Sequence, residues 1–192
     1  MGTIRKTASK EKIKQAFIVL LETEGFQKMT ISSLVKQAGI NRRTFYLNYL
    51  DKDDLAQQLI NDFFTGIAAI LKQDNGDRND WFSPAWFSPA AISQIIEYVQ
   101  SNFAFAHALL NSDLKGQVKE RLSQTLAQAF IHQHANLQQP KIKQPYASEI
   151  VFGGIASLFT LWIQRDMQES PATLLQIIEA YRATPPQQIL RT

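Results

Sequence analysis

Apolar residues recur three and four positions apart along almost all of this chain of 192 residues, which is the spacing of one face of an α-helix. The alternating pattern of a half-buried strand is not found, and neither is the turn of a β-hairpin. Apolar residues make up 45% of the chain, enough for a buried core and against a disordered protein. The sequence therefore predicts an all-α protein.

Capping residues divide this pattern into separate helices. The first half predicts one helix capped by Ser9 and ended by Gly25, one capped by Thr30, a short one capped by Asn41 and reaching about Asn48, and one capped by Asp51 and ending near Gln73. Two apolar stripes follow, at Ile92, Ile96, Val99, Phe103 and Leu110 and at Val118, Leu122, Leu126, Phe130 and Leu137. The helix from Tyr146 to about Arg165 is apolar on almost every side, so we expect it to be covered on more than one face. Ser170-Pro171 begins the last helix.

One segment interrupts the helical pattern. Trp-Phe-Ser-Pro-Ala occurs twice in succession over residues 81–90, and its two prolines exclude a continuous helix. A single tandem copy is too short for a repeat architecture. The duplicated segment is either a lid or a loop held by its own aromatic side chains, and both interpretations stay open.

Several functional classes lack support. Cysteine is absent, which excludes a disulfide scaffold and a cysteine nucleophile and suits a reducing cytosol. The N-terminus has no apolar signal-peptide core, and the apolar stretch 150–163 is too short to span a bilayer. His132 and His134 lie on nearly opposite faces of a helix, a poor metal pair, and no phosphate loop or nucleophile elbow is found. We therefore expect a cytoplasmic protein that is not an enzyme, with no cofactor, no metal and no membrane partner.

Charge is distributed unevenly along the chain. Residues 1–50 carry nine Lys and Arg against three Asp and Glu, whereas the whole chain has a net charge of only +3. A basic head on a mildly acidic body is expected when only the head meets an anion. A solvated basic N-terminus would have the same composition.

The segment from Thr30 to Lys52 has the layout of a helix-turn-helix. Two short helices are joined through Ala38-Gly39-Ile40, where alanine permits close approach and glycine permits a left-handed turn. The second helix is too short and too polar to be stabilised by packing alone. Its outward residues offer bidentate donors, hydroxyls and a flat ring to DNA, and they are Arg42, Arg43, Thr44, Tyr46 and Asn48. Lys52 begins the next helix, where it is placed to meet a phosphate.

This segment resembles the DNA-binding motif of the TetR family: a threonine-capped helix, Ala-Gly-Ile, a capping polar residue, Thr-Phe-Tyr, and then an aromatic, a lysine and a leucine at Tyr49, Lys52 and Leu55. The likeness covers residues 9–60, with Tyr49 (usually phenylalanine) and Asn48 (often histidine or tyrosine) as departures. The body is more weakly similar to members akin to dihydroxyacetone kinase activators. The resemblance implies a three-helix head over residues 1–55 and a helical-bundle body for ligand binding and dimerisation over residues 56–192.

The resemblance also implies roles for single residues. Thr30 and Ser32 would touch phosphate, the five outward residues would enter the major groove, and Lys52 would clamp the DNA backbone. The last two helices would join two copies through Gly153, Ser157, Leu174, Ile177, Ile178 and Tyr181, unless the glycines pack within one chain. A small-molecule site would be lined by Trp86, Phe103, His107, Phe159 and Trp162, although core packing is the better explanation of each of these residues.

The leading functional hypothesis is a homodimeric repressor that binds a double-stranded operator and is released by a small apolar or aromatic effector. The alternative is an activator or adaptor that is controlled by a partner protein and has no small-molecule pocket. A filled body core would favour partner control, and an enclosed cavity would favour ligand control. A helical-bundle enzyme is a third hypothesis with little support.

Overall fold

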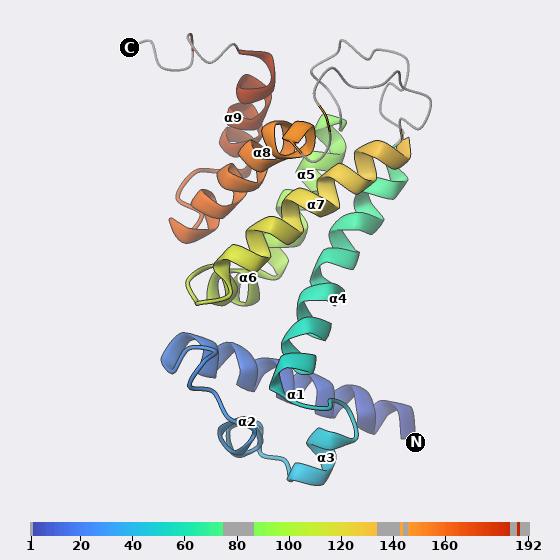
Figure 1. The fold of residues 1–192 in the computed structure, drawn as a ribbon, viewed down its shortest axis with the longest axis vertical. Helices are drawn as coiled ribbons and strands as arrows, with labels where there is room; N and C mark the ends of the chain where they lie inside the picture. Colours follow the sequence, from blue (N-terminus) through green and yellow to red (C-terminus); the bar gives the residue numbers. More distant parts are fainter. Residues whose placement is uncertain (1, 75–86, 134–142, 144–145, 185–187, 189–192) are drawn as a thin grey trace. The chain divides into compact units, whose positions relative to one another are not determined.

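The computed structural model of the chain describes residues 2–74, 87–133, 143, 146–184 and 188. Within these residues it contains helices and no strand, which confirms the predicted all-α class (Figure 1). The helices are α1 (Gly2–Thr23), α2 (Ile31–Ala38), α3 (Arg42–Tyr46), α4 (Lys52–Gln73), α5 (Pro89–Ser101), α6 (Phe103–Leu110), α7 (Lys115–Gln133), α8 (Tyr146–Gln164) and α9 (Pro171–Ala183). None of these helices combines the length and the hydropathy that a membrane-crossing segment requires.

The chain divides into two compact units. Unit 1 comprises Met1–Phe63 and Ala104–Val118, and unit 2 comprises Phe64–Phe103 and Lys119–Thr192. Helices α4 and α7 therefore begin in unit 1 and end in unit 2, and nearly all of α6 belongs to unit 1. The predicted head, residues 1–55, lies within unit 1, and its boundary falls inside α4.

The core of unit 1 is built on α1. Ile13, Phe17 and Leu20 are buried on one face of this helix. The Phe17 ring lies 6.3 Å from the ring of Phe26 and 6.4 Å from that of Phe105, so it contacts both the loop after α1 and helix α6. Burial of side chains of this size contributes about 1.5–3 kcal/mol each.

The prediction that Ser9 caps the first helix is wrong, because α1 already begins at Gly2 and Ser9 lies inside it. Residues 2–8 contain arginine, lysine and alanine, which favour helix, and no proline to stop it.

The core of unit 2 gathers around α8 and α9. Helix α8 buries Phe152, Ile155 and Phe159, and α9 buries Leu174 and Ile178. Helix α9 packs against both α5 and α8. The cover of α8 is incomplete, because Ile150 and Leu161 are 60% and 55% exposed.

The apolar stripe from Ile92 to Leu110 does not form one helix. Asn102 ends α5, and its side-chain amide donates to the Tyr98 carbonyl at 3.0 Å, after which α6 starts at Phe103. The predicted start of α9 is observed, because Ser170 caps a helix whose first residue is a proline. Ser88 caps α5 in the same way, although no helix start was predicted there. Residues 81–86 of the duplicated segment, and also His134, Leu137, Pro140 and Pro145, lie outside the described residues.

Candidate nucleic-acid interface

Capping interactions define the short helices α2 and α3. The Thr30 hydroxyl accepts the Ser33 N–H at 3.0 Å at the start of α2, and the Asn41 side chain accepts the Thr44 N–H at 2.8 Å at the start of α3. Each such cap contributes about 1 kcal/mol. Gly39 between them has φ +62°, and a Cβ there would meet nothing within 4 Å. The left-handed backbone, and not crowding, is therefore what requires glycine at this turn.

Buried aromatic rings fix the orientation of α3. Phe45 is fully buried, Tyr49 is 4% exposed, and their ring centroids lie 5.8 Å apart. Burial raises the pKa of Tyr49 to about 12, with smaller contributions from the carboxylates of Asp62 and Asp54. Because the Phe45 ring occupies the inner side of α3, the residues on the other side of this helix are turned to the surface.

The surface side of α3 presents cationic and aromatic groups. Arg42 and Arg43 are exposed, and Tyr46 is 53% exposed. The Arg42 Nη2 atom donates to the Ser32 hydroxyl at 2.6 Å, which links α3 to α2. Two guanidinium groups and one phenol ring on a short helix are suited to the base edges and phosphates of a DNA groove.

Two of the predicted groove residues are engaged within the head instead. Thr44 is half-buried, and its hydroxyl donates to the Asn41 side chain at 3.0 Å. Asn48 is half-buried, and its amide nitrogen donates to the Thr44 carbonyl at 2.8 Å. Their DNA contacts stay a prediction. To contact DNA, both side chains would have to break these hydrogen bonds within the head.

The Lys52 ammonium is also engaged, in a way that the sequence does not suggest. It donates to the carbonyls of Phe26 at 3.0 Å, Gln27 at 3.2 Å and Met29 at 3.1 Å. It also lies 4.8 Å from the centroid of the Phe26 ring. Since an ammonium has three N–H donors, none is left over for the predicted phosphate clamp in this conformation. Lys52 here ties the start of α4 to the loop that precedes α2.

Sequence reasoning missed two exposed leucines beside the predicted groove residues. Leu47 is 69% exposed and Leu50 is 79% exposed. The Leu50 N–H donates to Asp54 at 2.8 Å, and hydrogen bonds from Gln58 and from this N–H lower the pKa of Asp54. Leucine by itself indicates burial, so only the position of Leu47 and Leu50 relative to buried Phe45 and Tyr49 could have revealed them.

The predicted ligand-lining residues have different surroundings in the structure. Phe159 and Trp162 are each 2% exposed, and the Trp162 indole donates to the Glu169 carbonyl at 2.9 Å. Phe103 is half-buried, whereas His107 belongs to unit 1, where its Nδ1 lies 3.7 Å from Glu22. Trp86 lies outside the described residues.

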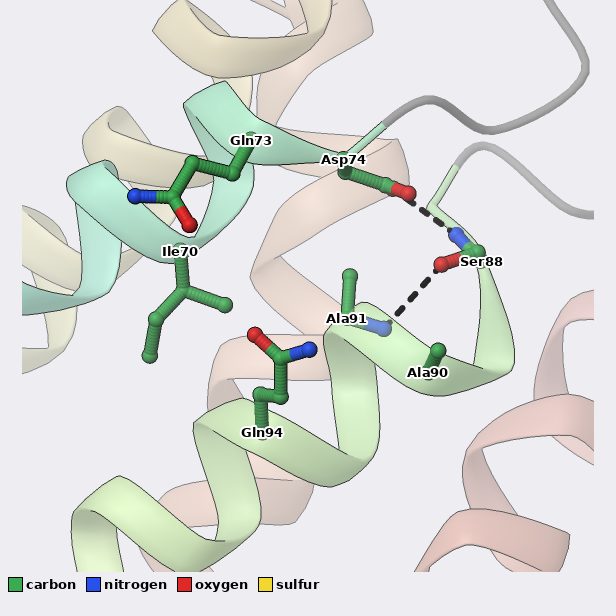
Figure 2. Close-up of a pocket in the computed structure, with 7 residues that line it drawn as sticks. All are labelled: Ile70, Gln73, Asp74, Ser88, Ala90, Ala91 and Gln94. Atoms are coloured by element: carbon green, nitrogen blue, oxygen red, sulfur yellow. Dashed lines mark hydrogen bonds between the residues drawn. The ribbon is translucent and has the colours of Figure 1, made fainter.

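Unit 2 has an open pocket of about 380 Å³ between the end of α4 and the start of α5. Asp74 is one of the residues that line it and accepts the Ser88 N–H at 2.9 Å, as Figure 2 shows. None of the four predicted ligand residues that the structure describes lines it; its walls are Ile70, Gln73, Asp74, Ser88, Ala90, Ala91 and Gln94.

The predicted dimer residues divide into buried and exposed groups. Leu174 is 2% exposed and Ile178 is fully buried, so they belong to the core of one chain and have almost no area to offer a partner. Gly153 is buried as well. A Cβ on the neighbouring Gly154 would collide with the Tyr181 hydroxyl, so this glycine packs against α9 of the same chain. Ile177 and Ser157 keep exposed area.

Comparisons with known proteins match both parts of the chain. Residues 15–59 match the family described as bacterial regulatory proteins, tetR family, and residues 88–182 match a TetR C-terminal family described as transcriptional regulator C-terminal region. The helix-turn-helix-type transcriptional regulator YvdT of Bacillus subtilis (strain 168) is 34% identical over 79 residues, which are 40% of this chain and 41% of that protein. The match therefore spans less than half the length of this relative.

Solved structures share the fold at low sequence identity. A TetR transcriptional regulator from Streptococcus agalactiae 2603V is 18% identical, with a TM-score of 0.63 over 94% of this chain and 97% of that one. The fatty acid degradation regulator FadR from Bacillus halodurans is 16% identical, with a TM-score of 0.57 over 91% of this chain and 94% of that one. FadR from Bacillus subtilis, solved in complex with stearoyl-CoA, is 16% identical, with a TM-score of 0.51 over 91% and 97%.

The fold and the capped α2–α3 pair define a helix-turn-helix regulator. The chain belongs to the TetR family of bacterial transcriptional regulators. Proteins of this family are DNA-binding regulators and not enzymes, in agreement with the expectation from the sequence.

Proposed function

We propose that this chain acts as a homodimer that binds an operator in double-stranded DNA through α3 and represses transcription from it. The observation that supports this most directly is the exposure of Arg42, Arg43 and Tyr46 on a helix whose other side is buried through Phe45. Binding to chromosomal DNA would make the protein cytoplasmic. Two heads must then fit successive major grooves, about 34–36 Å apart.

The surface of α8 supports the proposed dimer. Tyr146, Ile150 and Leu161 are 69%, 60% and 55% exposed, and half-buried Ser157 lies on the same helical face. We call these four residues the α8 stripe. An apolar stripe of this kind is a candidate interface, because covering it with a second copy removes its apolar area from water.

Release by a small effector bound in unit 2 is the second part of the proposal. Apolar α8, with the buried rings of Phe159 and Trp162, supplies the kind of surroundings in which such a ligand would bind. Because FadR of Bacillus subtilis was solved with stearoyl-CoA, long-chain acyl-CoA is a suitable first probe. If a series of acyl-CoA and aromatic compounds leaves both Tm and operator affinity unchanged, partner control becomes the better hypothesis.

Duplex binding at several salt concentrations tests the DNA-binding part. Genomic fragments selected by the purified protein would supply the operator, and fluorescence anisotropy would supply the affinity. We expect log affinity to fall linearly with log salt, because phosphate contacts release counterions. Selection that enriches no sequence, together with no binding at low salt, would contradict the proposal.

A further inference from the structure

The loop between α1 and α2 is held through its N–H groups by a residue that is far away in the sequence. The Phe26 N–H donates to Asp113 Oδ1 and the Gln27 N–H donates to Asp113 Oδ2, each at 3.1 Å. Asp113 lies in the turn between α6 and α7, and all three residues belong to unit 1. Two bonds to one carboxylate set both the position and the orientation of this loop.

The carbonyl groups of the same loop are held by Lys52. Its ammonium donates hydrogen bonds to the carbonyls of Phe26, Gln27 and Met29. The peptide groups at Phe26 and Gln27 are thus bound by a carboxylate on the N–H side and by an ammonium on the C=O side. We call Asp113 and Lys52 the loop clamp.

A short path leads from the loop clamp to the exposed side of α3. The loop ends at Thr30, which caps α2. Ser32 in the first turn of α2 accepts the hydrogen bond from Arg42 on α3. A shift of the loop therefore moves the cap of α2 and the hydroxyl that orients Arg42.

We propose that Asp113 is a positioning residue for DNA recognition, and that it links the start of α7 to the exposed side of α3. This inference rests on the proposed function. Helix α7 begins two residues after Asp113 and runs from unit 1 into unit 2. A displacement of about 0.5 Å takes a 3.1 Å N···O contact beyond hydrogen-bond range. A displacement of this size in the turn between α6 and α7 is therefore enough to release the loop and lower the affinity for DNA.

Substitution Asp113→Asn in the full chain tests this proposal, because an amide keeps the size of the side chain but cannot accept from both N–H groups. Loss of a negative charge alone strengthens binding to DNA, whereas loss of positioning weakens it, so the two effects have opposite signs. Asp62→Asn is the matched control, since Asp62 is an exposed carboxylate in unit 1. We expect Asp113→Asn to bind its operator roughly 10- to 100-fold more weakly, in line with the loss of charge-assisted bonds, and Asp62→Asn to bind equally or more tightly.

Hydrogen exchange of the Phe26 and Gln27 amides, measured by NMR, supplies a readout that does not depend on DNA. We expect faster exchange at these two amides in Asp113→Asn, with a far-UV circular dichroism spectrum like that of the wild type. Asp113→Glu keeps two acceptors on a longer side chain and should have intermediate operator affinity.

Three outcomes would overturn the proposal: operator affinity in Asp113→Asn that matches Asp62→Asn, unchanged exchange at both amides, or complete unfolding of Asp113→Asn with Asp113→Glu fully active. The last would mean that the carboxylate holds the fold as a whole. Failure of the wild type to bind any duplex would instead contradict the proposed function, while the exchange experiment would still report on the loop clamp.

Discussion

The guanidinium of Arg42 donates to the hydroxyl of Ser32, with 2.6 Å between Nη2 and Oγ, so the exposed cation of α3 is oriented by a residue of α2. We predict that Arg42→Ala lowers operator affinity by about 1–3 kcal/mol and relaxes the preference at one base pair. Lys36→Ala, which removes an exposed cation from α2, is the control and should change affinity uniformly across sequences. Competition binding with a library of single base-pair changes measures both effects. Unaltered base preference in Arg42→Ala would mean that this guanidinium does not contact bases.

Leu47 is 69% exposed beside Tyr46, and we predict that its side chain contacts a thymine methyl group. Replacing each operator thymine in turn by uracil removes one methyl group at a time. For the wild type, uracil at the contacted position should cost about 1 kcal/mol of binding free energy. For Leu47→Ser, the same uracil should cost almost nothing, because the contact is already lost. Leu50→Ser serves as the control. Equal sensitivity of Leu47→Ser and wild type to every uracil would exclude this contact.

Lys52 is expected to contribute to stability as well as to DNA binding. Lys52→Met leaves the carbonyls of Phe26, Gln27 and Met29 without their common donor. We predict that the free energy of unfolding falls by about 1–3 kcal/mol, as measured by urea titration. Lys36→Met, an exposed lysine on α2, should change it by less than about 0.5 kcal/mol. If Lys52→Met is as stable as the wild type and only loses affinity for DNA, the phosphate clamp predicted from the sequence is the better description.

Leu161 on the α8 stripe is expected to lie between two copies of the chain. A charged residue there leaves the single chain intact, since the side chain is 55% exposed, but places a carboxylate in the proposed interface. We predict that Leu161→Asp sediments as a monomer and binds the operator at least tenfold more weakly, because one head reads only half a site. Ile131→Asp is the control, because Ile131 is also an exposed apolar residue but lies on α7; this variant should remain dimeric. If Leu161→Asp remains dimeric, the dimer interface does not include Leu161.

Tyr49 is expected to make the head sensitive to alkaline pH. Its pKa is raised by burial to about 12, above the ordinary value of 10.0, so the folded state holds the phenol proton more tightly than the unfolded chain does. The stability that follows is fully present below pH 10 and is lost as pH rises toward 12, at up to about 1.4 kcal/mol per pH unit. Tyr49→Phe should remove this part of the decline, as measured by urea unfolding at several alkaline pH values. Parallel curves for the two proteins would exclude Tyr49 as the cause.

Local sequence was sufficient for the features that depend on one turn of chain. Thr30, Asn41 and Ser170 cap helices where a polar side chain precedes an apolar-periodic segment. Gly39 has the left-handed backbone expected between two short helices. Capping and φ preferences act over a few residues, so a single sequence carries most of this information, although the cap predicted at Ser9 was wrong. The all-α class and the helix-turn-helix follow from the same local rules.

Tertiary packing decided which side chains remain available at the surface. Lys52 looks like a free polar group in the sequence, yet its ammonium donates to the carbonyl of Phe26, 26 positions away. Leu174 and Ile178 look like an apolar stripe for a partner, yet α5 and α8 cover them, while Leu161 stays exposed. The bond from Asp113 to Phe26 joins residues 87 positions apart. Periodicity tells which residues share a face but not which element covers that face, and long-range partners are chosen only when the whole chain packs.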